Sequence, residues 1–365
     1  MTLLITGCAG FIGSNFVYYY LGKYKDRKII GLDKLTYAGN LENLENLTKE
    51  QKKRFKFIKG DICNRELVEY IFEEYDIDGV INFAAESHVD RSIYEPQVFL
   101  KTNVLGTQTL LDVAKKYWYD GKSWKSGKKF LQISTDEVYG SLGPTGYFTE
   151  KTPLDPHSPY SASKASADLI VKAYHDTYKM PINITRCSNN YGPYQFPEKL
   201  IPLMIWNALN HKELPIYGDG RQIRDWLYVE DHCRAIDIVY EKGKIGEVYN
   251  IGGHNEKENI EIVKKIIEIL REKTKDKKIS ESLIKHVKDR PGHDRRYGIN
   301  PSKIKKELGW KPEIMFEEGI EKTIEWYLNN LEWVKRVISG EYMEFYEKHY
   351  GKSNKTVVFK RSYKK

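Results

Sequence analysis

The stretch LLITGCAGFIGSNF, residues 3–16, places three glycines between a short apolar run and an amphipathic segment. The glycines are Gly7, Gly10 and Gly13, so their spacing is GxxGxxG. A strand–turn–helix junction of this kind brings backbone N–H groups close to a pyrophosphate and aims a helix amino terminus at its negative charge. Because glycine turns are common, the motif indicates a dinucleotide site only if its surroundings agree.

The first half of the chain alternates apolar runs, at 2–6, 28–33, 55–61, 79–85 and 129–135, with helical patterns at 11–24, 65–75, 96–117 and 159–178. This alternation predicts βαβ units and a parallel sheet with helices on both faces. From about residue 189, loops rich in proline and glycine dominate. We therefore predict an α/β fold with three parts. A Rossmann-type doubly wound NAD-binding domain covers 1–188, with later segments free to return to it; a smaller substrate-binding lobe lies mainly over 189–350; and a basic tail spans 351–365.

Acidic and small residues at the strand ends support a dinucleotide site. Asp33 ends the second expected strand, where a carboxylate can bind the adenosine ribose hydroxyls. An acid there also repels a 2′-phosphate, which favours NAD over NADP, although the adjacent Lys34 weakens this preference. Asp61 follows the third strand and is expected near the adenine. Ala84 and Ala85 follow the fourth, where small side chains let the cofactor approach the backbone.

Composition and charge argue against several other classes of protein. The net charge of +8 includes six basic residues in 351–365, so about +2 remains on the other 350 residues, too little for a nucleic-acid-binding face. No apolar run approaches the ~18 residues of a membrane span, and we predict no signal peptide. The four cysteines lie far apart and form no metal-ligand cluster. We predict reduced thiols in a cytoplasmic protein without a metal site.

The segment SPYSASKASAD, residues 158–168, places Tyr160 and Lys164 four apart on one helix face. A lysine ammonium and a positive nicotinamide both favour tyrosinate, so we predict a Tyr160 pKa lowered toward working pH. Tyrosinate can then take a proton from a substrate hydroxyl while NAD takes the hydride from the same carbon. Such a pair alone is usually plain helix surface, but beside the nucleotide motif it indicates a catalytic site.

The segment ISTDEVYG, residues 133–140, places Asp136 and Glu137 side by side where an apolar strand ends. Adjacent like charges repel each other and cost desolvation. Either Asp136 caps a helix and Glu137 is solvated, or the two carboxyl groups have separate chemical tasks.

The chain resembles the extended short-chain dehydrogenase/reductase family and, within it, the 4,6-dehydratases that act on dTDP-glucose. The resemblance runs from residue 1 to about residue 351. It is carried by TGCAGFIGSNF, YAGNLENL, AAESHVDRS, TNVLGT, ISTDEVYG, SPYSASKASAD, TRCSNNYGPYQFPEKLIP, IYGDGRQIRDWLYVEDH, YNIGG, DRPGHDRRY and LGWKP. The glycine and tyrosine motifs occur across the family, whereas STDEVYG is much more specific, because the epimerases and decarboxylases of the family lack the adjacent acid–base pair there.

The resemblance implies a role for each catalytic residue. Oxidation at C4 makes the C5 hydrogen acidic, Glu137 removes it, and Asp136 gives a proton to O6, so water leaves across C5–C6. Repulsion and burial would keep one carboxyl group protonated. Thr135 donates to the C4 oxygen beside Tyr160, and Lys164 completes the set. The hydride then returns to C6, so NAD is expected to stay tightly bound.

The resemblance also implies the binding residues. For NAD they are Gly7, Gly10, Phe11, Ile12, Gly13, Asp33, Lys34, Leu35, Thr36, Asp61, Ile62, Phe83, Ala84, Ala85, Ser87, Thr102, Tyr160, Lys164 and Asn190. For the nucleotide sugar they are Ser87, Thr135, Asn189, Lys199, Leu200, Pro215, Ile216, Tyr217, Arg224, Asn259, Arg290, Asp294 and Tyr297. Arg224 could instead form a structural salt bridge with Asp225 or Asp231. His88, His157 and His232 are interpreted as packing or loop residues.

The patterns at 96–117 and 159–178 carry more apolar residues than one buried stripe needs. Equivalent helices form a four-helix interface in the family, so a homodimer is expected. Three alternatives to a dTDP-glucose dehydratase remain open. A nucleotide-sugar 4-epimerase, or a dehydratase of another nucleotide hexose, would keep the same cofactor site. A non-catalytic NAD-sensing protein is the third hypothesis, but such proteins typically lose the tyrosine or lysine.

Overall fold

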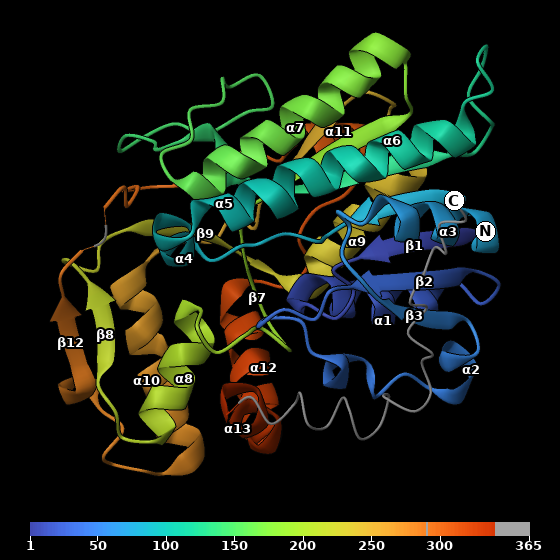
Figure 1. Cartoon of the computed structure of the whole chain (residues 1–365). Helices are drawn as coiled ribbons and strands as arrows, with labels where there is room; N and C mark the ends of the chain where they lie inside the picture. Colours follow the sequence, from blue (N-terminus) through green and yellow to red (C-terminus); the bar gives the residue numbers. More distant parts are fainter. Residues whose placement is uncertain (290, 340–365) are drawn as a thin grey trace.

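A parallel sheet of seven strands forms the centre of the larger lobe, as the alternating pattern predicted (Figure 1). The computed structural model describes residues 1–289 and 291–339. The strand order is β10-β6-β5-β4-β1-β2-β3. Their bounds are β1 Thr2–Thr6, β2 Lys28–Asp33, β3 Phe55–Lys59, β4 Gly79–Asn82, β5 Lys129–Thr135, β6 Ile182–Cys187 and β10 Val248–Ile251. The order reverses between β1 and β4, and crevices for ligands form at such reversals.

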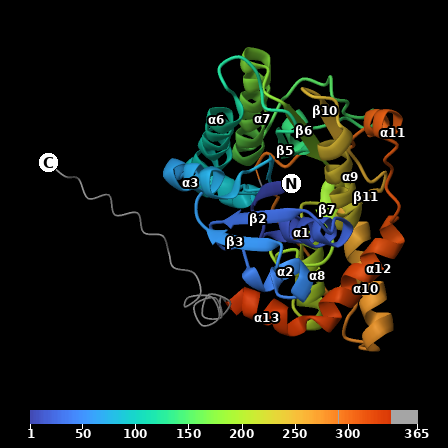
Figure 2. The same ribbon diagram turned by 90° about the vertical axis from the view of Figure 1, so that its right-hand side faces the viewer.

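Alternate side chains of β1 serve two hydrophobic cores, one on each face of the sheet. Leu3 and Ile5 pack in the core that includes α1 (Phe11–Lys23) and α9 (Val229–Lys242). Leu4, on the other face, packs with α3 (Arg65–Tyr75), α6 (Thr107–Trp118) and α7 (Pro159–Tyr178). Figure 2 shows these two helical layers on either side of the strands. The sheet is therefore covered on both faces, which confirms the doubly wound architecture.

The helix predicted over 96–117 is interrupted, which the periodicity did not reveal. Its parts are α5 (Pro96–Phe99), a seven-residue π-helix η2 (Leu100–Gly106) and α6. The Asn103 side chain accepts from the N–H of Glu86 at 2.9 Å and donates to its carbonyl at 3.0 Å. It also donates to the Ser163 hydroxyl at 2.8 Å. The wider turn thus places a buried amide between the loop after β4 and helix α7, and π-turns are frequent at functional sites.

The smaller lobe has two small sheets and its own core. One sheet has the order β11-β9-β7 and the other pairs β12 with β8. The strands are β7 Asn189–Tyr191, β8 Leu214–Tyr217, β9 Ile223–Tyr228, β11 Glu256–Glu258 and β12 Ile284–Val287, and the helices are α8 Leu200–Leu209, α10 Asn259–Thr274, α12 Phe316–Asn329 and α13 Leu331–Ser339. Between these elements, α9 and β10 return to the large sheet, so the two lobes interleave in the chain.

Short elements complete the described part of the chain. They are η1 Leu41–Leu44, α2 Lys49–Lys52, α4 Val89–Tyr94, η3 Asp136–Tyr139, η4 Glu281–Leu283 and α11 Ser302–Leu308.

The predicted basic tail, 351–365, lies outside the described residues. Of the helices described, none is long and apolar enough to cross a membrane. The four cysteines are unpaired, as expected, and residues 1–289 and 291–339 contain no cluster of side chains that could hold a metal ion.

A buried amide ties the central strands to helix α6. Asn82, at the end of β4, is 1% exposed. Its oxygen accepts from the Thr6 hydroxyl at 2.6 Å, and its nitrogen donates to Gln132 Oε1 at 2.9 Å and Thr107 Oγ1 at 3.1 Å. The network joins β1, β4, β5 and α6 directly below the strand ends.

We expect Asn82→Ala to lower the free energy of unfolding by about 2–4 kcal/mol, because it leaves several buried polar atoms without partners. Urea denaturation measures this change. Asn329→Ala, at an exposed position of α12, is the control and should change the free energy by less than about 0.5 kcal/mol. Equal effects of the two substitutions would contradict a special role for the network.

Candidate active site

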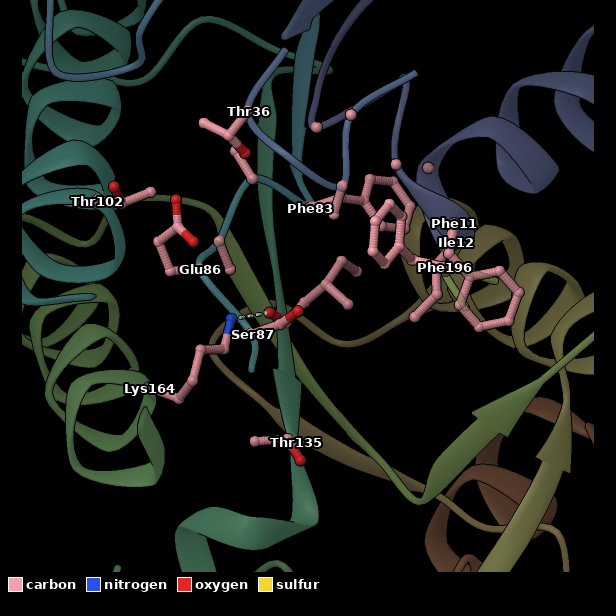
Figure 3. A pocket seen from close by; sticks show the side chains of 18 of the residues that line it. Phe11, Ile12, Thr36, Phe83, Glu86, Ser87, Thr102, Thr135, Lys164 and Phe196 are labelled. Atoms are coloured by element: carbon pink, nitrogen blue, oxygen red, sulfur yellow. Dashed lines mark hydrogen bonds between the residues drawn. The ribbon is translucent and has the colours of Figure 1, made fainter. Parts of the chain in front are cut away.

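A cavity of about 310 Å³ opens at the carboxyl ends of the parallel strands. Residues of β1, β2, β4, β5, β6 and β7, or of the turns that follow them, line it together with α7 and the π-helix. Figure 3 shows Phe11, Ile12 and Phe83 on one side of this cavity and Lys164 and Thr102 on the other. The strand reversal therefore produces the crevice that the strand order predicts.

The glycine turn after β1 leaves no room for side chains. Gly7 has φ +66°, and a Cβ there would lie 2.8 Å from the backbone nitrogen of Ala84. A Cβ on Gly13 would lie 2.2 Å from the carbonyl oxygen of Gly7. Helix α1 starts after Gly10 with no side-chain cap and no acid in its first turn. The residues at its amino terminus, Gly10 to Gly13, line the cavity, and a helix start next to a cavity suits a pyrophosphate.

Asp33 and Asp61 lie on the cavity wall at the ends of β2 and β3. The Asp33 carboxylate accepts from the N–H groups of Ala9 at 3.0 Å and Leu35 at 2.8 Å. Burial raises the pKa of Asp33, and these two donors oppose the rise. The Lys34 ammonium pairs with Asp61 at 2.9 Å. The pairing with Asp61 neutralises the charge of Lys34. Lys34 therefore no longer weakens the preference for NAD over NADP that Asp33 predicts.

The acidic pair after β5 is divided between a buried and a half-buried carboxyl group. The Thr135 hydroxyl accepts from the N–H of Glu137 at 3.3 Å and so caps η3, which rules out Asp136 as the cap. Asp136 is 1% exposed, and its Oδ2 has no hydrogen-bond partner among the described residues. Burial first, then the neighbouring Glu137, raises the pKa of Asp136 well above its usual value. Burial therefore favours the protonated form of Asp136, which is the form that a proton donor needs.

Tyr160 and Lys164 share one face of α7, as the spacing predicts, and both line the cavity. Burial, followed by Glu137, raises the pKa of the Tyr160 phenol. The expected lowering depends on the positive nicotinamide of bound NAD as well as on Lys164. The Lys164 ammonium donates to the carbonyl of Ile133 at 2.7 Å (Figure 3), and burial lowers the pKa of Lys164. The Thr135 hydroxyl hydrogen-bonds the phenol and only partly offsets burial. The lysine alone does not activate the tyrosine.

Hydrogen bonds of a buried ion pair connect η3 to helix α7. Arg186 of β6 donates to Asp168 of α7 at 2.9 Å and to the Tyr139 hydroxyl at 2.9 Å. The same hydroxyl donates to Asn250 of β10 at 2.8 Å. Since Tyr139 lies in the 3-10 helix that begins with Asp136, these contacts hold the acidic pair in place relative to Tyr160.

The structure brings nearly all predicted cofactor residues to one cavity. All of them line it except Leu35, which is buried, has φ 56° and donates its N–H to Asp33. Of the predicted sugar-nucleotide residues, Ser87, Thr135, Asn189 and Lys199 line the same cavity. The Lys199 ammonium donates to the carbonyl of Ser87 at 3.0 Å, which links the two lobes across the opening.

The other predicted substrate residues lie in the smaller lobe. Arg224 packs over the Tyr297 ring at 4.2 Å and donates to the carbonyls of Ile223 and Asp294. Asp225 and Asp231 were the alternative partners of Arg224. The Asp225 carboxylate accepts from the N–H groups of Gly253 and Asn255. The Asp231 carboxylate accepts from the Arg234 guanidinium and from the N–H groups of Glu313 and Ile314. The Tyr297 hydroxyl donates to Asp294 at 2.5 Å. Leu200 begins α8, Asn259 begins α10, and Pro215, Ile216 and Tyr217 lie on β8. Arg290 lies outside the described residues.

Charge interactions connect this group to the acidic pair. Glu137 raises the pKa of Tyr297, after burial, and the Arg224 guanidinium opposes the rise in the pKa of Asp136. The two groups of predicted residues therefore adjoin at Asp136 and Glu137. A ligand that extends from the cavity toward Arg224 would pass this pair.

The three singled-out histidines have ordinary partners. His88 caps α4 through the N–H of Arg91, and His157 bonds Asp294 at 2.6 Å. His232 is fully buried and contacts Asn190 at 2.9 Å, and burial lowers its pKa to about 3. Packing or loop roles for these side chains agree with the structure.

Several cavity residues were not predicted: Leu32, Ala38, Gly39, Gly60, Glu86, Ile133, Ser134, Cys187, Ser188, Gln195, Phe196 and Glu198. Most of them lie inside the motifs that carried the resemblance. The motifs therefore indicated these regions of the chain but not the individual cavity residues. Ser134 Oγ and Asn189 Oδ1 are buried and have no hydrogen-bond partner among the described side chains and backbone. Orphaned polar atoms around a cavity fit a polar ligand such as a dinucleotide.

We expect Asp136→Asn to raise the melting temperature at about pH 8, with the advantage shrinking toward about pH 4. The folded pKa of Asp136 is raised, so its contribution is full below the unfolded pKa and is lost as the pH rises through the folded pKa. Calorimetry across this range measures the difference, with exposed Asp26→Asn as control. A wild type more stable than the variant at pH 8 would contradict a protonated Asp136.

Comparison with known proteins agrees with this geometry. The family model described as GDP-mannose 4,6 dehydratase matches residues 4–323. A dTDP-glucose 4,6-dehydratase of Xanthomonas campestris pv. campestris is 53% identical over 344 residues, 93% of this chain and 97% of that protein.

Two solved structures of the same enzyme are also similar. The dTDP-glucose 4,6-dehydratase of Bacillus anthracis, in complex with NAD, has a TM-score of 0.82 and 52% identity, and covers 92% of this chain and 99% of its own. That of Streptomyces venezuelae, also with NAD bound, has a TM-score of 0.84 and 44% identity, and covers 92% of this chain and 100% of its own. The chain therefore belongs to the dTDP-glucose 4,6-dehydratase family.

Proposed function

We propose that the chain dehydrates dTDP-glucose to dTDP-4-keto-6-deoxy-glucose with tightly bound NAD. One observation carries the mechanism: Asp136, a buried carboxyl group whose pKa is raised by burial and by Glu137, lies next to Glu137 in the cavity that Tyr160 and Lys164 also line. An epimerase would use Tyr160 and Lys164 but has no task for two adjacent carboxyl groups. A non-catalytic NAD-sensing protein would need neither pair.

The residues divide the chemistry between the sugar carbons. Bound NAD supplies the redox chemistry, accepting a hydride from C4 and giving it back at C6. Tyr160, hydrogen-bonded by Thr135, takes the proton of the C4 hydroxyl once a positive charge beside it offsets burial. Glu137 removes the proton at C5, and Asp136 protonates O6 as water leaves. Protonated Glu137 then returns its proton to C5 when the hydride reaches C6, so the ketone product is saturated. Adjacent positions on η3 suit neighbouring carbons of one hexose.

The two lobes have separate tasks in this proposal. The seven-stranded sheet with its glycine turn holds NAD, and the smaller lobe holds the nucleotide diphosphate near Arg224 and Lys199. Arg224 is suited to this because a guanidinium fork matches phosphate oxygens. Unpaired cysteines support a reducing, cytoplasmic location.

A second copy of the chain is expected on the face formed by η2, α6 and α7. Large apolar side chains are exposed there: Leu100 is 50% exposed, and Leu105 and Leu169 are each 57% exposed. Helices α6 and α7 lie side by side along the molecule (Figure 1). Two such pairs can pack as a four-helix bundle across a two-fold axis, and we propose that the enzyme is a homodimer.

Replacing Glu137 by Gln should slow product formation by roughly 10²–10⁴-fold, because it removes the base and keeps the shape. Asp136→Asn should slow elimination similarly, and both variants should still form reduced cofactor from dTDP-glucose. Tyr160→Phe should block that oxidation. Single-turnover absorbance of NADH and assay of the 4-keto product separate the two steps.

UDP-glucose serves as the substrate control in the same assay, since a preference for it would reassign the nucleotide. Dehydration at the wild-type rate in the Asp136→Asn, Glu137→Gln double variant would refute the mechanism. Stoichiometric accumulation of NADH with product would refute the return of the hydride.

Charge at the exposed apolar face should separate the subunits. We expect the Leu105→Glu, Leu169→Glu double variant to be monomeric at micromolar concentration, because four buried carboxylates cannot be paired at the interface. Light scattering after gel filtration measures the mass. Met315→Glu, at a site that is 50% exposed elsewhere, should leave the dimer intact. A monomeric wild-type protein would exclude the proposed interface.

A further inference from the structure

Helix α13 contacts the segment that follows β2, far from it in sequence. Trp333 Nε1 donates to the side-chain oxygen of Asn43 at 3.0 Å, across 290 positions of the chain. Next to it, Arg336 donates to the carboxylate of Glu42 through Nε at 2.9 Å and Nη2 at 2.8 Å. Trp333, Asn43 and Glu42 are all buried. The end of the described chain is thus held against the cofactor lobe.

Asn43 also contacts the glycine turn. Its Nδ2 donates to the carbonyl of Ala9 at 2.9 Å, and the backbone N–H of Asn40 donates to the same oxygen at 3.0 Å. The N–H of Gly10 donates to the carbonyl of Gly7 at 3.1 Å. The peptide between Ala9 and Gly10 is therefore held at its oxygen and at its nitrogen.

The orientation of this peptide decides where the start of α1 points. Gly10 is the N-cap residue, and no side chain caps the helix. Phe11 and Ile12 follow it on the cavity wall, and N–H groups in the first helical turn have no partner within the helix. Rotation of the Ala9–Gly10 peptide would turn these donors away from an anion in the cavity.

An indole N–H can only donate a hydrogen bond, so it must face the oxygen of the Asn43 amide. The amide nitrogen is then directed at Ala9. With the indole N–H absent, the amide could rotate and present its oxygen to the Ala9 carbonyl, which would repel it.

We propose that Trp333 is a positioning residue for the dinucleotide, acting through Asn43 on the glycine turn. The inference rests on the proposed function, because it takes NAD as the ligand of that turn. It makes helix α13, which belongs to the core of the smaller lobe, a determinant of cofactor retention in the larger one.

Trp333→Phe tests this, because it keeps most of the ring and deletes only the donor. In the holoenzyme, exchange of bound NAD with isotope-labelled NAD, followed by mass spectrometry, should become about fivefold faster, the effect of one lost hydrogen bond. The control is Trp326→Phe. Trp326 packs against Trp333 with ring centroids 5.1 Å apart, and its indole makes no hydrogen bond to any residue the structure describes. It should exchange NAD at the wild-type rate.

Asn43→Ala removes the side chain that links Trp333 to the carbonyl of Ala9. It should accelerate the exchange of NAD to a similar extent. Adding Trp333→Phe to Asn43→Ala should add less than the single change does alone, because both act through one contact. Melting temperatures of all variants separate loss of packing from loss of the donor. Equal exchange rates in the two tryptophan variants, or additive effects of Trp333→Phe and Asn43→Ala, would overturn the inference. Failure to convert dTDP-glucose, with the exchange difference intact, would overturn the proposed function and support the inference.

Discussion

Backbone contact between the turn after β1 and the end of β4 is the constraint on which the rest of the molecule depends. At Gly7 and Gly13 the neighbouring atoms occupy the space of a side chain. This close approach places β1 next to β4 at the point where the strand order reverses, and so opens the cavity between their carboxyl ends. The start of α1, the ends of β5 and β6 and the acidic pair all line this cavity.

Burial acts on Asp136, Tyr160 and Lys164 in the same sense, against charge. It raises the pKa values of Asp136 and Tyr160 and lowers that of Lys164. For Asp136 this is useful at once, since a neutral acid is what protonation of a leaving oxygen needs. For Tyr160 it is an obstacle, because a phenol in dry surroundings resists ionisation. In the proposed mechanism, a positive charge on the bound ligand would offset this effect of burial on Tyr160.

Local patterns in the sequence predicted an element well where one buried stripe of a helix or one apolar run of a strand defines it. The helices at 65–75 and 159–178 have the predicted bounds, and Asp33 ends β2 as expected. Expected strands at 55–61 and 79–85 end earlier, at Lys59 and Asn82. The π-helix escaped prediction because widening a turn by one residue leaves the surrounding apolar spacing almost unchanged. The raised pKa of Tyr160 and the contact of Trp333 with Asn43 depend on distant segments, and no local pattern carries that information.

The π-helix also sets the relative rotation of two surfaces, the cavity wall and the outer apolar face. Within its seven residues, Thr102 faces the cavity, Asn103 is buried, and Leu105 is exposed on the outer face. Each residue of an α-helix turns the chain by about 100°, so loss of one residue here would rotate all of α6 relative to α5. The outer apolar face and the cavity wall would then no longer be in register. The length of this segment is therefore constrained more tightly than its composition, and related chains should tolerate substitutions in it more readily than a single insertion or deletion.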